Sequence, residues 1–147
     1  DPTRLEVLQS AHIAKAELLV IAADDPETSL RIARLARRHF PQVRVIARAR
    51  NRQHAFRLMD MGVAAIRETL LSSIEIGKLA FISLGIRHAT AEHYAQLFIE
   101  HDERILAEQY LVHDNDAALV ASAEDAYRQL EALFDADREP ADGETQG

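Results

Sequence analysis

The 147-residue sequence contains no cysteine, and its basic residues include just two lysines. Without cysteine, disulfides, thiolate metal sites and a cysteine nucleophile are excluded. No apolar run approaches the roughly 20 residues needed to span a bilayer, and the first residues lack a signal-peptide pattern. The chain is therefore expected to be soluble and cytoplasmic.

Positive charge is also scarce, because 24 acidic residues face 17 basic ones and the formal charge is -7. A nucleic-acid partner is not expected, since phosphate backbones are bound by net or strongly clustered positive charge. The length fits one domain with one hydrophobic core.

A glycine-rich phosphate loop is missing as well, although residues 17–69 otherwise follow the pattern of a nucleotide-binding α/β fold. Apolar runs of strand length at 17–23, 43–47 and 63–66 alternate with helical patterns at 26–40 and 51–61. This order requires parallel strands, and the continuous first run predicts a strand buried on both faces. The segment is thus predicted to be the second half of a Rossmann-like sheet. Residue 1 is expected to lie inside a larger domain, because Asp1-Pro2-Thr3 is typical of the end of a turn.

Short polar signals mark the ends of these elements. Asp25 precedes Pro26 and is a predicted N-cap, and Asn51 is expected to start the next helix. Gly62 is well placed as a left-handed helix cap. Arg48 and Arg50 are expected just past the second strand, where they could meet an anion or an acidic partner surface. Exposed salt bridges are the equally open alternative.

From residue 67 onward the pattern is helical. A helix at 70–84 should end at Gly85, and its apolar surface is too wide for the outer helix of a monomer, which predicts a homodimer. Thr90 should cap a further helical stretch to about residue 134, which the polar group at 113–116 could interrupt. The predicted organisation is a half Rossmann-like domain at 1–66, a helical dimerisation and regulatory extension at 67–135, and a disordered tail at 136–147.

Specific segments carry a family resemblance. The segments IARARNRQHAFRL and IRETLLSSIEIGKLAFISLG, together with the initial DPTR and the AADDPETS that follows the first strand, resemble the cytoplasmic RCK (KTN) domain of Kef-type glutathione-gated potassium efflux systems. The match covers roughly residues 1–116. It implies a regulatory domain without catalysis of its own, at the cytoplasmic face of the bacterial inner membrane and joined to a potassium/proton antiporter in the same polypeptide. It also implies an adenine nucleotide (AMP or NAD(H)), glutathione or its adducts, and a flavin-containing quinone reductase as a further partner.

The resemblance implies particular site residues. Arg67, directly before Glu68-Thr69, matches the family's glutathione-binding arginine, and a guanidinium can grip a glutathione carboxylate with two hydrogen bonds. Asp102 matches a position where glutathione-gated members carry Asn, so an acid here would repel an anionic ligand unless an arginine compensates. One alternative is a related member with another ligand. The other is that Asp102 is a solvated helix residue and Arg67 a surface arginine before a helix, neither with a role in ligand binding.

Four further residues form a candidate nucleotide site. Ligands of doubly wound sheets sit beyond the carboxyl ends of the strands, where Asp24 and Asp25 are expected. By resemblance, Asp1 and Thr3 would approach the adenine. The alternative is that Asp25 caps its helix and Asp24 ends a strand.

No residue pattern supports catalysis. The seven histidines match no metal-binding motif, and most are expected at the surface. No metal is expected. Two other function classes stay open: the cofactor-binding half of an NAD(P)-dependent oxidoreductase, and a soluble regulatory subunit of a potassium uptake system.

Overall fold

The computed structural model describes residues 1–138 and divides the chain into two compact units, residues 1–73 and the residues from 74 onward. The division falls inside the helix that follows the sheet. In the first unit, α1 (Leu5–Ser10) and a short 3-10 turn, η1 (Ile13–Lys15), precede a strand-helix alternation. Its elements are β1 (Leu18–Ile21), α2 (Pro26–His39), β2 (Arg44–Ala49), α3 (Arg52–Asp60) and β3 (Ala64–Arg67).

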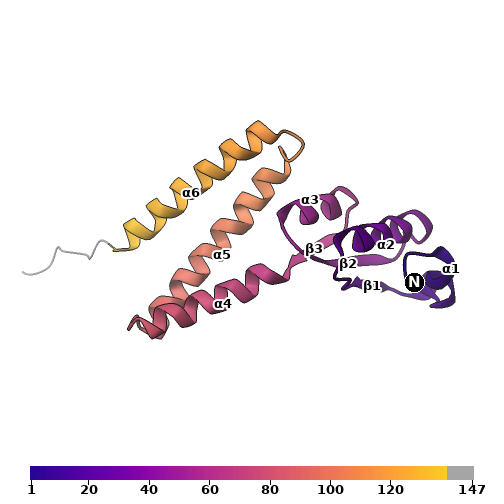
Figure 1. The fold of residues 1–147 in the computed structure, drawn as a ribbon, viewed down its shortest axis with the longest axis horizontal. Helices are drawn as coiled ribbons and strands as arrows, with labels where there is room; N and C mark the ends of the chain where they lie inside the picture. Colours follow the sequence, from indigo (N-terminus) through magenta and orange to yellow (C-terminus); the bar gives the residue numbers. More distant parts are fainter. Residues whose placement is uncertain (139–147) are drawn as a thin grey trace, which may run out of the picture. The chain divides into compact units, whose positions relative to one another are not determined.

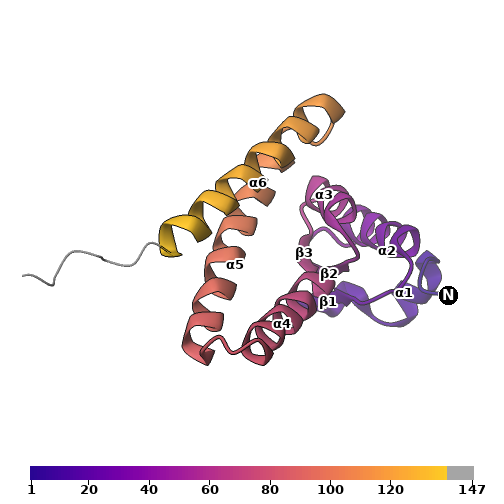
Figure 2. The same cartoon turned by 60° about the vertical axis from the view of Figure 1, so that its left-hand side comes forward.

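The sheet of the first unit is parallel, with the strand order β1-β2-β3. Ile21 pairs with Ala47, and Ala49 pairs with Arg67, so the carboxyl ends of all three strands meet at one edge. Both crossover helices lie on the same side of the sheet (Figures 1 and 2). A parallel sheet followed by long helices confirms the predicted α/β class.

The helix ends of this unit follow the predicted local signals. Asp25 is the N-cap of α2 and accepts a hydrogen bond from the Thr28 amide at 2.7 Å. Asn51 is the N-cap of α3, and its side chain accepts from the His54 amide at 2.9 Å. Gly62, at φ 69°, takes the left-handed conformation after α3 that favours glycine. These short contacts fix where each helix starts and stops.

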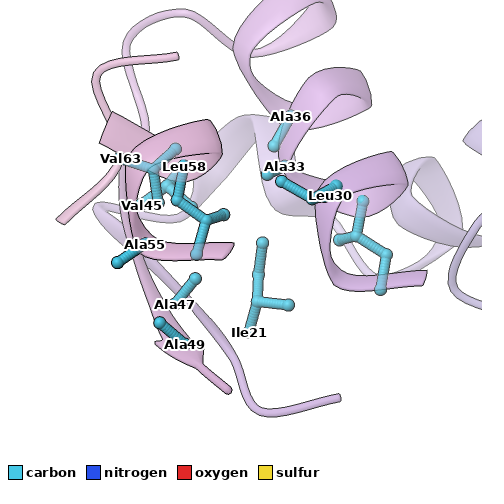
Figure 3. Packing of buried hydrophobic residues seen from close by; sticks show 11 residues of the cluster. Ile21, Leu30, Ala33, Ala36, Val45, Ala47, Ala49, Ala55, Leu58 and Val63 are labelled. Carbon is cyan, nitrogen blue, oxygen red and sulfur yellow. The ribbon is translucent and has the colours of Figure 1, made fainter. Parts of the chain in front are cut away.

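The core lies between the sheet and its two helices. Figure 3 shows Leu30, Ala33 and Ala36 of α2 beside Leu58 of α3, facing small strand residues such as Ala47. Small side chains on β2 let the helices approach the sheet closely, and such interiors pack at crystal-like density. This core sets the position of the strand ends that carry the candidate site.

Within residues 1–73, no element covers the opposite face of the sheet. Leu18 and Val20 of β1 are 45% and 61% exposed, and Ile66 of β3 is 51% exposed. The prediction that the first strand is buried on both faces is therefore wrong here. The apolar run correctly indicated a strand, but α2 and α3 cover one face alone.

The second unit consists of helices. α4 (Glu68–Ser83) passes from the first unit into the second, and is followed by α5 (His88–Tyr110) and α6 (Asp116–Arg138). The last two lie side by side (Figures 1 and 2). Tyr94 of α5 holds the unit together, because its ring packs edge-on against Phe81 of α4 and Phe134 of α6 at centroid distances of 5.9 and 5.5 Å.

The bounds of α5 and α6 differ in part from those predicted from the sequence. The helix predicted from residue 91 to about 134 is interrupted near the polar group, as the sequence allowed, and becomes α5 and α6. Thr90 is not an N-cap, because α5 begins at His88 after Arg87. α6 continues to Arg138, so residues 136–138 of the predicted tail are helical, while 139–147 lie outside the described residues.

Within 1–138, no helix has both the length and the apolarity that a membrane crossing requires.

Candidate functional site at the carboxyl edge of the sheet

One arginine links the ends of the three strands. The Nη2 atom of Arg48 contacts Oδ1 of Asp24, which follows β1, and its Nη1 lies 3.2 Å from Oε2 of Glu68, the first residue of α4. Arg48 lies within β2 rather than past it, because the strand continues to Ala49. The predicted strand end at residue 47 was therefore wrong, whereas Arg50 does follow the strand.

A polar cavity of about 110 Å³ opens at this edge. Its lining comes from the residues at the carboxyl ends of β1 and β2 and from the first turns of α3 and α4: Ala23, Asp24, Arg48, Ala49, Arg50, His54, Glu68 and Thr69. Ligands of open parallel sheets bind at such edges. Three residues predicted from the sequence, namely Asp24, Arg48 and Arg50, are thus brought together at one cavity.

Charge around this cavity is balanced between two arginines and two carboxylates. Both carboxylates contact Arg48, and their attraction raises the pKa of its guanidinium above its ordinary value, with the hydrogen bond that Arg48 donates to Asp24 as the largest cause. The Asp24 side chain is 92% exposed and that of Glu68 is 60% exposed. Exposed pairs are weak, so another anion can compete for Arg48.

His54 is a lining residue that the sequence did not single out. It is buried, and its Nδ1 accepts a hydrogen bond from the Arg50 backbone amide at 3.1 Å. Burial lowers the pKa of the imidazole, with the nearby Arg57 as a second cause. Most histidines do lie at the surface as predicted, because His12, His39, His88 and His93 are exposed, whereas His54 and His101 are buried.

The remaining predicted nucleotide residues make local contacts. Thr3 donates to the Asp1 carboxylate from its hydroxyl at 2.6 Å and from its amide at 2.9 Å. Asp25 uses its carboxylate to cap α2, and these hydrogen bonds lower its pKa. The contacts thus pair Asp1 with Thr3, Asp25 with Thr28 and Asp24 with Arg48.

Arg67 and Asp102 lie in different units. Arg67 is the last residue of β3, pairs with the cavity residue Ala49, and directly precedes Glu68. Asp102 lies in α5 and is 7% exposed, next to His101. The His101 Nε2–H donates to the Ala126 carbonyl of α6 at 2.9 Å, and Arg104 donates to His101 Nδ1 at 3.0 Å. Asp102 is thus part of a buried polar stretch of α5.

The described part of the chain, residues 1–138, contains no group of three or more acidic or histidine side chains arranged to hold a metal ion. His54, Glu68 and Thr69 were missed as lining residues. Glu68 and Thr69 could have been found from the sequence, because they directly follow the predicted third strand, whereas no local pattern marks a histidine inside a helix.

Two family models match the chain in succession. The TrkA-N domain model matches residues 1–68, and the model of the potassium efflux system KefB C-terminal domain matches residues 72–147. The glutathione-regulated potassium-efflux system protein KefC of Cronobacter sakazakii is 39% identical over 135 residues, which are 91% of this chain and 21% of that protein. The chain thus spans about a fifth of this relative's length.

A solved structure is also similar. The Shewanella denitrificans Kef CTD in AMP-bound form is 38% identical, and the superposition covers 75% of this chain and 70% of that chain with a TM-score of 0.71. The shared fold therefore includes most of both chains.

Proposed function

Because this chain belongs to the family of Kef-type potassium efflux regulatory domains, we propose that it senses ligands and thereby gates a potassium/proton antiporter. The observation that carries the proposal is the ordered match of a TrkA-N model and a KefB C-terminal model to its two parts. The KefB C-terminal model covers half of the chain. This match favours an efflux regulatory domain over the two alternatives, the cofactor-binding half of an NAD(P)-dependent oxidoreductase and a soluble regulatory subunit of a potassium uptake system.

The proposed whole protein is an inner-membrane antiporter with this domain on its cytoplasmic side. The KefC relative is nearly five times as long as the matched part, which leaves room for membrane spans in the same polypeptide. The domain would act without catalysis of its own. A flavin-containing quinone reductase is proposed as an activating partner, in line with the family resemblance.

The proposed ligands are an adenine nucleotide and glutathione or its adducts. The Shewanella Kef CTD is in an AMP-bound form, and the KefC relative is a glutathione-regulated system. In this chain, Asp24 with Asp25, and Asp1 with Thr3, are proposed for the nucleotide. Gating then requires that a ligand bind one arrangement of the antiporter more tightly than the other.

Arg67 and Asp102 are proposed to contact glutathione. Arg67 stands at the carboxyl end of β3, where a guanidinium can take a carboxylate in two parallel hydrogen bonds. Asp102 is buried in α5 and carries an acid where the glutathione-gated pattern has Asn. This acid disfavours an anionic ligand such as glutathione unless a neighbouring arginine compensates for its charge.

A homodimer is proposed through α4. This helix has no buried residue, and its Ile76 and Leu79 are 68% and 63% exposed, while Leu84, directly after the helix, is 81% exposed. Contiguous exposed apolar surface of this kind marks an interface. A second copy of the chain would cover it.

The direct test is calorimetric titration of the chain with AMP, with reduced glutathione and with a bulky glutathione adduct. Saturable binding of glutathione or the adduct that Arg67→Ala removes is expected, because bidentate charge-assisted bonds are the strong ones. Arg38→Ala is the matched control, since Arg38 is an exposed arginine at the end of α2. Absence of binding for all three ligands by the folded chain would overturn the proposal.

A further inference from the structure

The hydrogen bonds at the start of α3 determine which nitrogen of His54 carries the proton. A backbone amide can only donate, so the Arg50 N–H at 3.1 Å requires Nδ1 of His54 to be the acceptor. The neutral ring therefore has its proton on Nε2. Asn51 accepts from the His54 amide at 2.9 Å, which fixes the backbone that holds the ring.

The protonated nitrogen of His54 lacks a partner. The residue is 4% exposed, and within residues 1–138 its Nε2 is one of two buried side-chain atoms with no hydrogen-bond partner, the other being Oγ of Ser29. Buried donors in native proteins are nearly always satisfied, by protein, water or ligand. His54 lines the cavity at the carboxyl edge of the sheet, which can hold such a partner, whereas Ser29 is not among the residues that line this cavity.

The rest of the cavity favours an anionic partner. Arg48 supplies a fixed positive charge, and the Thr69 hydroxyl can donate a further hydrogen bond. The two carboxylates in the lining, Asp24 and Glu68, both contact Arg48 from partly exposed positions. They are weakly held and can give way to a ligand oxygen.

We infer that this cavity is an anion subsite in which the Nε2–H of His54 and the guanidinium of Arg48 bind a phosphate or carboxylate oxygen of the regulatory ligand. The inference rests on the proposed ligand-sensing function and names the residues that contact the ligand. The incoming oxygen replaces Glu68 on Arg48. The occupied cavity therefore frees the first residue of α4, the helix that leaves the sheet.

Two variants separate the ligand role of His54 from its structural role. The side-chain oxygen of His54→Asn can take the place of Nδ1 and keep the Arg50 amide bonded, but nothing replaces Nε2–H. The side-chain nitrogen of His54→Gln can take the place of Nε2–H, whereas the Nδ1 acceptor is lost. If His54 has a structural role alone, His54→Gln should bind the ligand less well than His54→Asn. If the Nε2–H of His54 contacts the ligand, His54→Asn should be the variant with the weaker binding.

The experiment titrates the wild-type chain and both variants with inorganic phosphate, AMP and reduced glutathione by calorimetry. About tenfold weaker binding by His54→Asn, with near wild-type binding by His54→Gln, is expected, in line with the loss of one charge-assisted hydrogen bond. If His54→Asn weakens the binding of AMP but not of glutathione, the group bound at the subsite is a phosphate. If it weakens the binding of glutathione but not of AMP, the bound group is a carboxylate. Equal binding by His54→Asn and wild type overturns the inference.

A measurement on the wild type covers the case in which a variant fails to fold. The ¹⁵N resonance of His54 Nε2 should shift on addition of phosphate, AMP or glutathione, and an unchanged resonance at saturation overturns the inference. If glutathione binding depends on Arg67 but not on His54, the proposed function stands and the inference fails. If phosphate binds at His54 while AMP and both forms of glutathione do not bind, the inference stands and the proposed function fails.

Discussion

Nη1 of Arg48 lies 3.2 Å from Oε2 of Glu68, while Nη2 of the same guanidinium contacts Asp24. One side chain of β2 thus joins the end of β1 to the first residue of α4. Both acids are more than half exposed, so these contacts hold the site in place without making it rigid. The arrangement suits a cation that exchanges partners when a ligand arrives.

The first prediction concerns the competitor for this guanidinium. Glu68→Gln should strengthen binding of inorganic phosphate about two- to fivefold, because an exposed ion pair of modest strength no longer competes for Arg48. Calorimetric titration at low salt measures the change. Glu6→Gln is the control, since Glu6 pairs with Arg4 and neither residue lines the cavity. Unchanged or weaker binding by Glu68→Gln would show that Glu68 does not oppose the ligand.

The second prediction concerns the departure from the glutathione-gated pattern. Asp102→Asn should strengthen binding of reduced glutathione about tenfold, because it removes a negative charge from a buried position near an anionic ligand. Fluorescence competition or calorimetry measures the affinity. Glu103→Gln, at the exposed neighbouring position of α5, removes the same charge and should leave binding unchanged. Equal effects of the two variants would point to a general charge effect.

The third prediction is a dependence of stability on pH through His54. Burial lowers the pKa of this imidazole below 6.5, so the unfolded chain takes up the proton at a higher pH than the folded chain. The contribution to stability is therefore complete above pH about 6.5 and is lost as the pH falls through the folded pKa. Urea unfolding at pH 7.5 and pH 5.5 measures this loss.

Variants of two histidines test the source of that pH dependence. His54→Asn should lose less stability than the wild type between the two pH values, since its side chain does not titrate. His39→Asn, at an exposed position at the end of α2, should behave as the wild type does. A pH dependence that survives His54→Asn in full would assign the effect to another group.

Local signals in the sequence predicted the helix ends of the first unit because each depends on a few neighbouring residues. Asp25, Asn51 and Gly62 all act as predicted. The end of β2 was predicted too early, since Arg48 continues the ladder with β3, and pairing with a neighbour strand is not a local property. Exposure of Val20 also depends on which elements cover the sheet, and the sequence of one strand does not contain that information.

The candidate site was predicted in part. Residues that follow strand ends, such as Asp24 and Arg50, could be placed at a common edge from the order of the elements alone. His54 could not, because its burial depends on the packing of α3 and its role depends on the tautomer that the Arg50 amide selects. The functional meaning of Arg67 and Asp102 came from family resemblance and stays a prediction.

The last prediction concerns the exposed apolar face of α4. Leu79→Glu should convert the proposed homodimer into a monomer at micromolar concentration, because a charge at a 63% exposed apolar position would be buried unpaired in the dimer. Multi-angle light scattering measures the mass. Gln96→Glu adds the same charge at an exposed polar position of α5 and should leave the dimer intact. A wild-type monomer at this concentration, or a dimer that tolerates Leu79→Glu, would exclude α4 as the interface.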